Sequence, residues 1–370
     1  MATENSRAVL TIDLGALSEN YRRLRAAAAG SEVAGVVKAN AYGLGLAPVA
    51  DALRAAGCRS FFVAHLDEGL ELRSQLPDAE VYVLHGLAAG REHSFVEARL
   101  IPVLNQPGEL ARYAALARAQ GERLPAALQI DTGMCRLGFA RAEIEALDHA
   151  LLAPLDLRLV MSHLACAEER ANPLNERQRT RLEEARALLP AAPASLANSS
   201  GIFLGAPFQL DLCRPGVALY GVNPTPERPN PMVPVVTIEA PVLQVHEVQE
   251  PGTVGYGATY TTRAGSRIAT VPVGYADGYL RAASNRATAR IGGRAVPLAG
   301  RVSMDLITLD VTDLPPDTVR PGTMVELLGG PDGLDELATA AGTIGYEVLT
   351  RLGSRFARRY IRRGSGTNRA

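Results

Sequence analysis

The chain has 370 residues, of which 47% are hydrophobic and 21% are charged, and its formal net charge is −1. This length allows two domains with a sizeable core. The near-zero charge gives no reason to expect a nucleic acid or an anionic membrane as a partner, and no stretch reaches the roughly 18 apolar residues of a membrane span.

The N-terminal residues Met1 to Arg7 are polar and lack the apolar segment of a signal peptide, so we expect a cytoplasmic protein. Over the next 210 or so residues, apolar strand-like runs alternate with stretches of helical periodicity. The expected strands are 8–13, 33–37, 61–65, 81–85, 102–105, 126–130, 157–162, 195–197 and 217–220. The expected helices include 17–28, 46–56, 108–119 and 177–189. Regular alternation at this count predicts a (β/α)8 barrel, in which functional residues lie at the C-terminal ends of the strands.

Lys38 stands at such a strand end, directly after the apolar run 33–37. It is the single lysine among 38 basic residues, and the other 37 are arginine. Arginine can replace lysine wherever only surface charge matters, but a guanidinium cannot form a Schiff base with a carbonyl compound. The sequence therefore favours a covalent role for Lys38.

Other polar residues lie next to later strands of the expected barrel, most of them after a strand, whereas Arg214 with Gly216 precedes the expected strand at 217–220. The segment Asp131 to Arg136 follows the strand at 126–130, and His163 ends the run at 157–162. Asn198 with Ser199, and Arg214 with Gly216, come late in barrel order, where barrels commonly build a phosphate site from backbone N–H groups. Each residue has an ordinary structural explanation by itself. Their convergence on one face predicts a site.

A proline-rich segment at 223–234 separates the barrel from short β-rich runs and predicts a domain boundary. We expect a barrel domain over 1–228 and a mostly-β domain over 229–370, with strands within 235–248, 267–273, 289–298, 306–311 and 324–328 and helices at 334–341 and 346–352. The four cysteines are far apart and show no zinc-binding spacing, so no metal site is expected.

The segment Val37 to Gly43 closely resembles the cofactor-lysine motif of alanine racemases. Further segments resemble that family in the same order, in both domains: 7–20, 131–138, 162–167, 197–199, 214–221, 255–260, 274–278, 300–305 and 345–347. The resemblance implies a pyridoxal 5′-phosphate enzyme that interconverts L-alanine and D-alanine. It also implies a homodimer in which the second domain completes the active site of the partner subunit.

The resemblance implies a role for each matching residue. Lys38 would hold the cofactor and act as one base, and Tyr256 of the partner subunit would be the other. Arg214 would face the pyridine nitrogen, and His163 with Arg214 would stand behind the tyrosine. The cofactor-binding positions would be Lys38, Tyr42, His163, Asn198, Ser199, Arg214, Gly216, Val217 and Tyr220. Arg136 and Met304 would bind the substrate carboxylate, and Tyr275 would lie at the entrance.

Three positions depart from the familiar family pattern. Gln129 stands where many members carry a carbamylated lysine, so either its amide orients Arg136 or a bound anion does. Cys135 replaces a glycine, and we expect its backbone to avoid positive φ. Ser354 aligns where some members place a phosphate-contacting tyrosine.

Three other functions compete with alanine racemisation as interpretations of the sequence. A related decarboxylase would need an acidic residue at the position of Arg214, and a non-catalytic pyridoxal-phosphate carrier would lack the second domain. A racemase of broader specificity, acting on serine or other amino acids, is compatible with the motifs. Cell-wall D-alanine supply and L-alanine catabolism would use the same chemistry.

Overall fold

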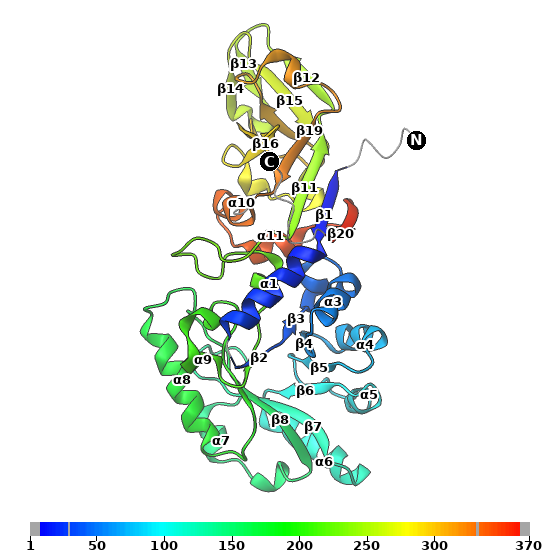
Figure 1. The fold of residues 1–370 in the computed structure, drawn as a ribbon, viewed down its shortest axis with the longest axis vertical. Coiled ribbons are helices and arrows are strands. Elements are labelled where there is room, and N and C mark those ends of the chain that lie inside the picture. The colour runs from blue at the N-terminus through cyan, green and yellow to red at the C-terminus, as the bar shows by residue number, and fades with distance from the viewer. Residues whose placement is uncertain (1–7, 29, 331–332, 363–370) are drawn as a thin grey trace.

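The barrel forms the lower part of the molecule in the computed structural model, which describes residues 8–28, 30–330 and 333–362 (Figure 1). Its strands are β2 (Glu32–Val33), β3 (Gly35–Val36), β4 (Ser60–Val63), β5 (Glu80–Val83), β6 (Ile101–Leu104), β7 (Leu124–Gln129), β8 (Leu155–Met161), β9 (Ala194–Ser195) and β10 (Leu212–Cys213). Strands β3 to β9 pair in chain order, all parallel. β10 pairs with β2 and is hydrogen-bonded to the β9 segment through Asp211 N to Ala194 O, which closes the sheet into the expected barrel.

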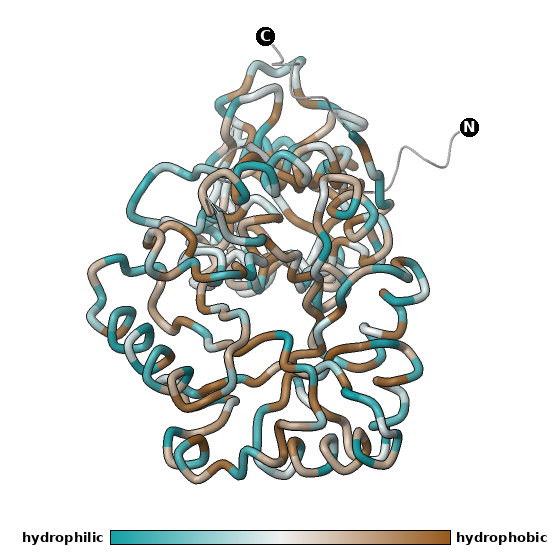
Figure 2. Tube along the Cα trace, turned by 60° about the horizontal axis from the view of Figure 1, so that its bottom comes forward, coloured by the Kyte–Doolittle hydropathy of each residue, from teal (hydrophilic) through white to brown (hydrophobic). Residues whose placement is uncertain are grey.

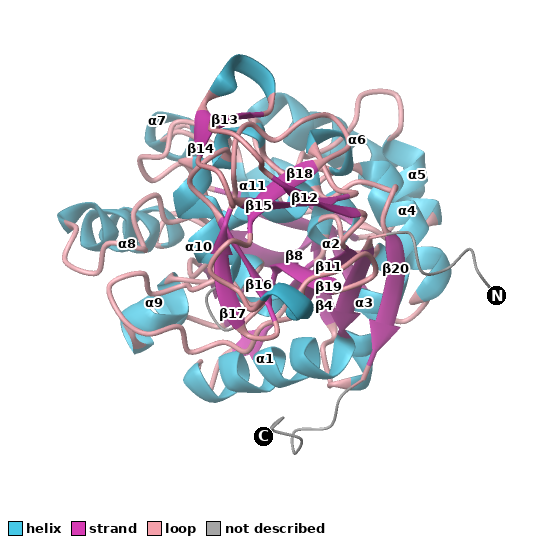
Figure 3. Ribbon diagram, turned by 90° about the horizontal axis from the view of Figure 1, so that it is seen from above, coloured by secondary structure: helices cyan, strands magenta, loops and turns pink. Residues whose placement is uncertain are grey.

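Most of the barrel helices lie outside the strands, as the view from above shows, whereas the short α2 (Lys38–Tyr42) lies over the strand ends (Figure 3). The other barrel helices are α1 (Leu14–Ala27), α3 (Leu46–Ala55), α4 (Leu66–Gln75), α5 (Glu92–Glu97), α6 (Pro107–Gln120), α7 (Arg141–Glu145), α8 (Pro173–Arg186) and α9 (Ala206–Gln209), with 3-10 turns η1 (His149–Leu151), η2 (Gly201–Leu204) and η3 (Val217–Tyr220). In α1, Leu17, Tyr21 and Leu24 repeat at helical spacing and are buried, and the Asp13 carboxylate caps the first turn. Figure 2 shows the corresponding difference between buried and exposed segments, with the hydrophobic colour concentrated on the inner ones.

The second part of the chain is rich in antiparallel β-structure. Its elements are β11 (Val236–Pro241), β12 (Gln244–Glu247), β13 (Gly252–Val254), η4 (Tyr256–Ala258), β14 (Tyr260–Thr262), β15 (Arg267–Val271), η5 (Tyr275–Asp277), η6 (Arg281–Ala283), β16 (Thr288–Ile291), β17 (Arg294–Pro297), β18 (Ile307–Asp310), η7 (Pro316–Thr318), β19 (Met324–Leu328), α10 (Gly333–Ala341), α11 (Gly345–Arg351) and β20 (Ala357–Ile361). The largest sheet has the order β17-β16-β19-β11-β1-β20.

Strands β10, β13, β14 and β20 were not among the expected strands, and two of the expected strands differ from the structure. The first apolar run, β1 (Val9–Asp13), does not enter the barrel but lies between β11 and β20 in the second sheet. Residues 217–220 form the 3-10 turn η3 and not a strand. Both were wrong because a short apolar run gives no information about its tertiary partners and does not distinguish a strand from a buried turn.

None of the helices in the described part of the chain is long and apolar enough to span a membrane. The polar N-terminal residues Met1 to Arg7 lie outside the described residues.

Candidate active site

A cavity of 740 Å³ opens at the C-terminal ends of the barrel strands. Most residues expected in the site line it, and they come from different strand ends: Lys38, Tyr42, Gln129, Arg136, His163, Asn198, Ser199, Arg214, Gly216 and Val217. The parallel barrel explains this convergence, because it brings residues far apart in the sequence to one rim. Tyr220 lies behind the cavity wall, and Tyr256, Tyr275 and Met304 lie in the second part of the chain, away from the cavity.

Lys38 is half-buried and begins the turn after β3. Burial lowers the pKa of its amine below the ordinary value, the nearby Arg136 lowers it further, and Glu68 opposes the shift. A lowered pKa increases the fraction of neutral amine, which is the form that attacks a carbonyl carbon.

The turn after Lys38 is left-handed. Ala39, Asn40, Ala41 and Tyr42 all have φ between 52° and 54°, and the first three have ψ near 50°. This conformation costs roughly 1–2 kcal/mol per residue for residues with a Cβ atom, so contacts from the surrounding structure must hold it. One such contact is local, because the Asn40 side chain accepts the N–H of Leu46 at 2.7 Å.

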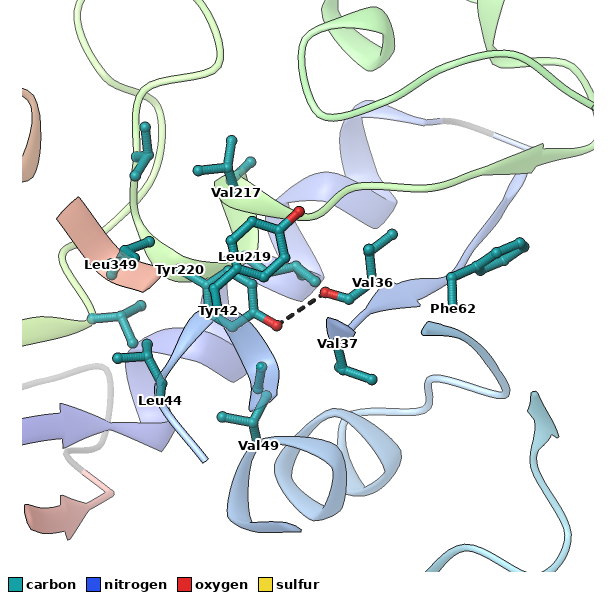
Figure 4. Close-up of a cluster of buried hydrophobic side chains, with 14 of the residues drawn as sticks. Val36, Val37, Tyr42, Leu44, Val49, Phe62, Val217, Leu219, Tyr220 and Leu349 are labelled. Atoms are coloured by element: carbon teal, nitrogen blue, oxygen red, sulfur yellow. Dashed lines mark hydrogen bonds between the residues drawn. The ribbon is translucent and has the colours of Figure 1, made fainter. Parts of the chain in front are cut away.

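Tyr42 is buried at the base of the cavity and packs against Tyr220, with ring centroids 4.7 Å apart (Figure 4). The Tyr220 hydroxyl donates to the carbonyl of Val36 at 3.0 Å. Tyr220 therefore supports the end of β3, just before Lys38, and does not itself line the cavity.

Ser199, Gly216 and η3 form a cradle beside Tyr42. The Ser199 hydroxyl accepts the N–H groups of Gly216 at 3.0 Å and of Ala218 at 3.2 Å. A Cβ atom on Gly216 would overlap the Tyr42 hydroxyl. Hydroxyl and N–H donors around a position that admits no side chain fit a phosphate group.

Replacing Gly216 by alanine should weaken cofactor binding while the protein stays folded. Relief of the overlap with Tyr42 costs about 1–3 kcal/mol, which corresponds to roughly 5- to 150-fold in affinity. Cofactor retained after dialysis measures the effect. Gly108→Ala on α6 is the control, because its Cβ atom would meet nothing closer than 3.9 Å. Equal retention in both variants would contradict the cradle.

Arg214 lies buried in the cavity wall, with 4% of its surface exposed. Its guanidinium donates to the Ser195 hydroxyl and to the carbonyl of Ser162, and it lies 5.9 Å from the centre of the Phe62 ring. Among the described residues it forms no ion pair with a carboxylate. Burial lowers its pKa to about 10, so the group stays cationic at neutral pH.

His163 is buried near the same cationic groups, among them Arg214. Burial lowers its pKa to about 3, and Arg214, Arg136 and Lys38 act in the same direction. The imidazole is therefore neutral at physiological pH, and it offers a hydrogen bond without adding charge.

The pKa of His163 predicts a pH effect on stability. The folded-state pKa of about 3 lies below the ordinary 6.5, so the unfolded chain binds the proton more tightly. This contribution to stability is complete above pH 6.5 and is lost as the pH falls toward 3. His163→Asn should reduce the loss of stability over that range, measured by urea unfolding at a series of pH values. The exposed His149→Asn should follow the parent; the same curve for all three proteins would contradict the prediction.

The loop after β7 carries Arg136 to the cavity. The Asp131 carboxylate accepts the N–H groups of Gly133, Met134 and Cys135 at 2.9, 2.9 and 3.1 Å. Cys135 has φ of 55°, so the expectation that it avoids positive φ was wrong. The three hydrogen bonds to Asp131 stabilise this loop conformation, which a glycine at position 135 would adopt without such help.

Gln129 is 7% exposed and donates its amide N–H to the carbonyl of Leu137 at 3.1 Å. Leu137 is the neighbour of Arg136, so the amide bonds to the loop that carries the arginine, and both expectations for this position stay predictions.

His85 and Tyr346 are among the cavity residues that were not assigned a role from the sequence. His85 stands two residues beyond β5, and Tyr346 reaches the cavity from α11, with its ring centroid 6.2 Å from that of Tyr42. Ser354 is exposed and does not line the cavity, and its equivalence to the family tyrosine stays a prediction. The strand-end rule could have identified His85, and the family-like segment 345–347 contains Tyr346.

An amine of lowered pKa beside a cradle for a phosphate is what covalent capture of pyridoxal phosphate requires. The fold and the cavity together define a pyridoxal-phosphate-dependent enzyme built on a barrel.

The comparisons with known proteins narrow this class. Residues 12–224 match the alanine racemase N-terminal domain and residues 235–360 match the alanine racemase C-terminal domain. The chain therefore belongs to the alanine racemase family, which comprises pyridoxal-phosphate-dependent isomerases, and the resemblance of its motifs to that family is confirmed.

The relatives match nearly the whole chain. It is 51% identical over 369 residues to an alanine racemase of Rhodospirillum rubrum, covering 98% of this chain and 99% of the relative. It is 52% identical over 357 residues to a catabolic alanine racemase of Mesorhizobium japonicum, covering 96% and 93%. The crystal structure of alanine racemase from Bartonella henselae with covalently bound pyridoxal phosphate superposes with a TM-score of 0.92 at 40% identity, covering 96% of this chain and all of that one.

Proposed function

We propose that the protein interconverts L-alanine and D-alanine by moving the Cα proton between two bases, Lys38 and Tyr256 of the partner subunit. The observation that supports this proposal is that Lys38 and Tyr256 lie in different parts of the chain, and only Lys38 lines the cavity. Lys38 lies in the barrel cavity, whereas Tyr256 lies in the second part of the chain with 72% of its surface exposed and does not line that cavity. Tyr275 and Met304 of the same part of the chain are exposed as well, and several exposed hydrophobic side chains in this part support contact with another copy.

Pyridoxal phosphate, when bound, withdraws electrons from Cα of the amino acid and so makes its proton acidic. Lys38 anchors the cofactor and, once free, takes or returns the proton on one face of Cα. Its lowered pKa favours the neutral amine, which is the form that accepts the proton.

The residues around the cavity bind and orient the cofactor. Ser199, Gly216, Val217 and Tyr42 would hold the phosphate, with Asn198 beside them and Tyr220 behind. Arg214 would lie at the pyridine nitrogen and, because it remains cationic, would leave that nitrogen unprotonated. This placement favours rapid return of the proton to Cα over side reactions, and it speaks against the decarboxylase alternative.

Arg136 binds the substrate carboxylate at the cavity mouth, and the second part of the partner subunit contributes Met304 and Tyr275. Within one chain these two residues already form a unit, because Ala276 N donates to Met304 O at 2.9 Å and Tyr275 N to Ser303 O at 3.0 Å. Met304 is 54% exposed and Tyr275 42% exposed, which supports their burial against another subunit. Neutral His163 would act with Arg214 behind the tyrosine.

We further propose the division into a cofactor-binding part, 1–228, and a part that completes the partner's site, 229–370, in a homodimer. The chain between η3 and β11 contains no helix or strand, which supports a boundary there, although β1 joins the second sheet. D-alanine supply for peptidoglycan and alanine catabolism both fit this reaction, and a cytoplasmic location stays a prediction.

Isotope exchange in heavy water tests the reaction. Deuterium should appear at Cα of both L-alanine and D-alanine with no release of carbon dioxide. Carbon dioxide would indicate a decarboxylase, and no exchange at all would indicate a carrier. Faster exchange with serine than with alanine would replace alanine as the substrate.

A further inference from the structure

The left-handed turn after Lys38 is tied to a neighbouring strand end by one carboxylate. Glu68, in the first turn of α4, accepts the N–H of Ala39 through Oε1 at 2.6 Å. Its Oε2 accepts the N–H of Ala64 at 2.8 Å and that of His65 at 3.2 Å. The two oxygens therefore connect the residue after the lysine, beyond β3, with the two residues after β4.

The Glu68 carboxylate bonds to a turn whose backbone conformation is unfavourable for residues with a Cβ atom. Ala39 has φ of 54° and starts the run of positive φ values, although it carries a Cβ atom. A carboxylate that accepts its N–H fixes the direction in which the chain leaves Lys38. Charge-assisted bonds of this kind are shorter and stronger than bonds between neutral groups.

The negative charge of Glu68 also affects the amine of Lys38. Glu68 is the acidic neighbour that opposes the lowering of the Lys38 pKa, whereas Arg136, from the loop after β7, lowers it. The remaining groups facing the lysine are His85 after β5 and His163 after β8. Glu347 of α11 also lines the cavity, but its carboxylate is bonded to Thr343 and Arg351.

We infer that Glu68 is a positioning residue for Lys38: its carboxylate holds the left-handed turn in register with β4 and supplies the negative charge that faces the lysine nitrogen. This inference rests on the proposed role of Lys38. Glu68 does not line the cavity, so its carboxylate acts only through the backbone of Ala39 and through its field.

The test compares Glu68→Ala and Glu68→Gln with a matched control. Glu143 occupies the same capping position in α7, accepts the N–H of Ala140 at 2.8 Å, and does not line the cavity. Glu143→Ala therefore removes an equivalent helix cap without touching the turn. All proteins are studied as holoenzymes, together with Lys38→Ala.

Glu68→Ala should lower kcat/KM by about 10- to 100-fold, because a displaced reacting group loses rate steeply with distance, and it should lose cofactor on dialysis. Glu68→Gln should recover part of both, since its amide oxygen still accepts one N–H. Glu143→Ala should change thermal stability only.

The single lysine allows a direct reading of the nitrogen itself. With 15N in the lysine side chain, one Nζ resonance reports on Lys38. Both Glu68 variants should shift its titration to lower pH, because the protonated nitrogen loses its negative neighbour. If Glu68→Ala does not fold, Glu68→Gln carries this measurement.

Glu68 variants that match Glu143→Ala in cofactor retention, in kcat/KM and in the Nζ titration would overturn the inference. If Lys38→Ala keeps the visible absorbance of the linked cofactor, the proposed function fails instead. The two failures are therefore distinguishable.

Discussion

Replacing Lys38 by arginine should leave a folded protein that holds no covalent cofactor and has lost at least about 10³-fold in activity. The positive charge and most of the side-chain volume survive this change, and the half-buried position tolerates a long side chain. The primary amine does not survive. A guanidinium neither attacks a carbonyl carbon nor gives up a proton at neutral pH, so both anchoring and general base catalysis, worth about 10²–10⁴-fold alone, are removed.

Borohydride reduction followed by peptide mass spectrometry checks this result. In the parent, the cofactor mass should appear on the one peptide that contains Lys38. A double variant that adds Arg22→Lys to Lys38→Arg keeps the number of lysines at one and moves the amine to an exposed place on α1, where 55% of the side chain of Arg22 is exposed. It should stay unlabelled and inactive. A labelled, active double variant would show that any lysine suffices and would remove Lys38 from the mechanism.

The barrel could be predicted from the sequence because its information is local. Each strand is a short apolar run, each helix repeats buried residues at helical spacing, and parallel pairing follows from their alternation. The strand-end positions of Lys38 and His163 then followed from the barrel alone, whereas Arg214 was expected before a strand at 217–220 and in fact follows β10, which was not predicted.

The placement of β1 could not be predicted in the same way. Val9 to Asp13 has a strand-like pattern, and that pattern is equally compatible with the barrel and with the second sheet. Only the partners, β11 antiparallel on one side and β20 parallel on the other, decide the matter. Those partners lie more than 200 residues away in the sequence.

Site residues were predicted where only one residue type can perform the chemistry. They were missed where their role depends on the three-dimensional arrangement of the backbone. Lys38 and Arg214 carry chemistry that other residues cannot supply. Glu68 was not found, because a glutamate in the first turn of a helix usually serves only as a cap, and its bond to Ala39 depends on a left-handed turn that the alanines do not suggest. Cys135 shows the same limit, since its positive φ depends on the carboxylate of Asp131.

Replacing Tyr256 by phenylalanine should lower racemisation by about 10²–10⁴-fold, the usual contribution of a general acid–base group. The ring remains, so packing against another subunit should be preserved. Proton exchange at Cα should persist for one enantiomer only, because Lys38 still serves its own face. Tyr360→Phe is the control: it removes a hydroxyl that donates to the carbonyl of Leu44 at 2.8 Å, outside the cavity. Exchange of both enantiomers at the parent rate would remove Tyr256 from the mechanism.

Mixing the two defective chains should restore activity if the sites are shared. In a dimer of one Lys38→Ala chain and one Tyr256→Phe chain, one site receives the intact Lys38 of one subunit and the intact Tyr256 of the other, while the second site is doubly defective. Random pairing in a two-fold dimer then predicts about one quarter of the parent activity, although each variant alone is nearly inactive. Isolating the mixed dimer with two different affinity tags should raise this to about one half. If Lys38 and Tyr256 met within one chain, neither site of the mixed dimer would be complete and mixing would restore nothing. Co-expression therefore decides whether the exposed face that bears Tyr256 belongs to the active site of another subunit.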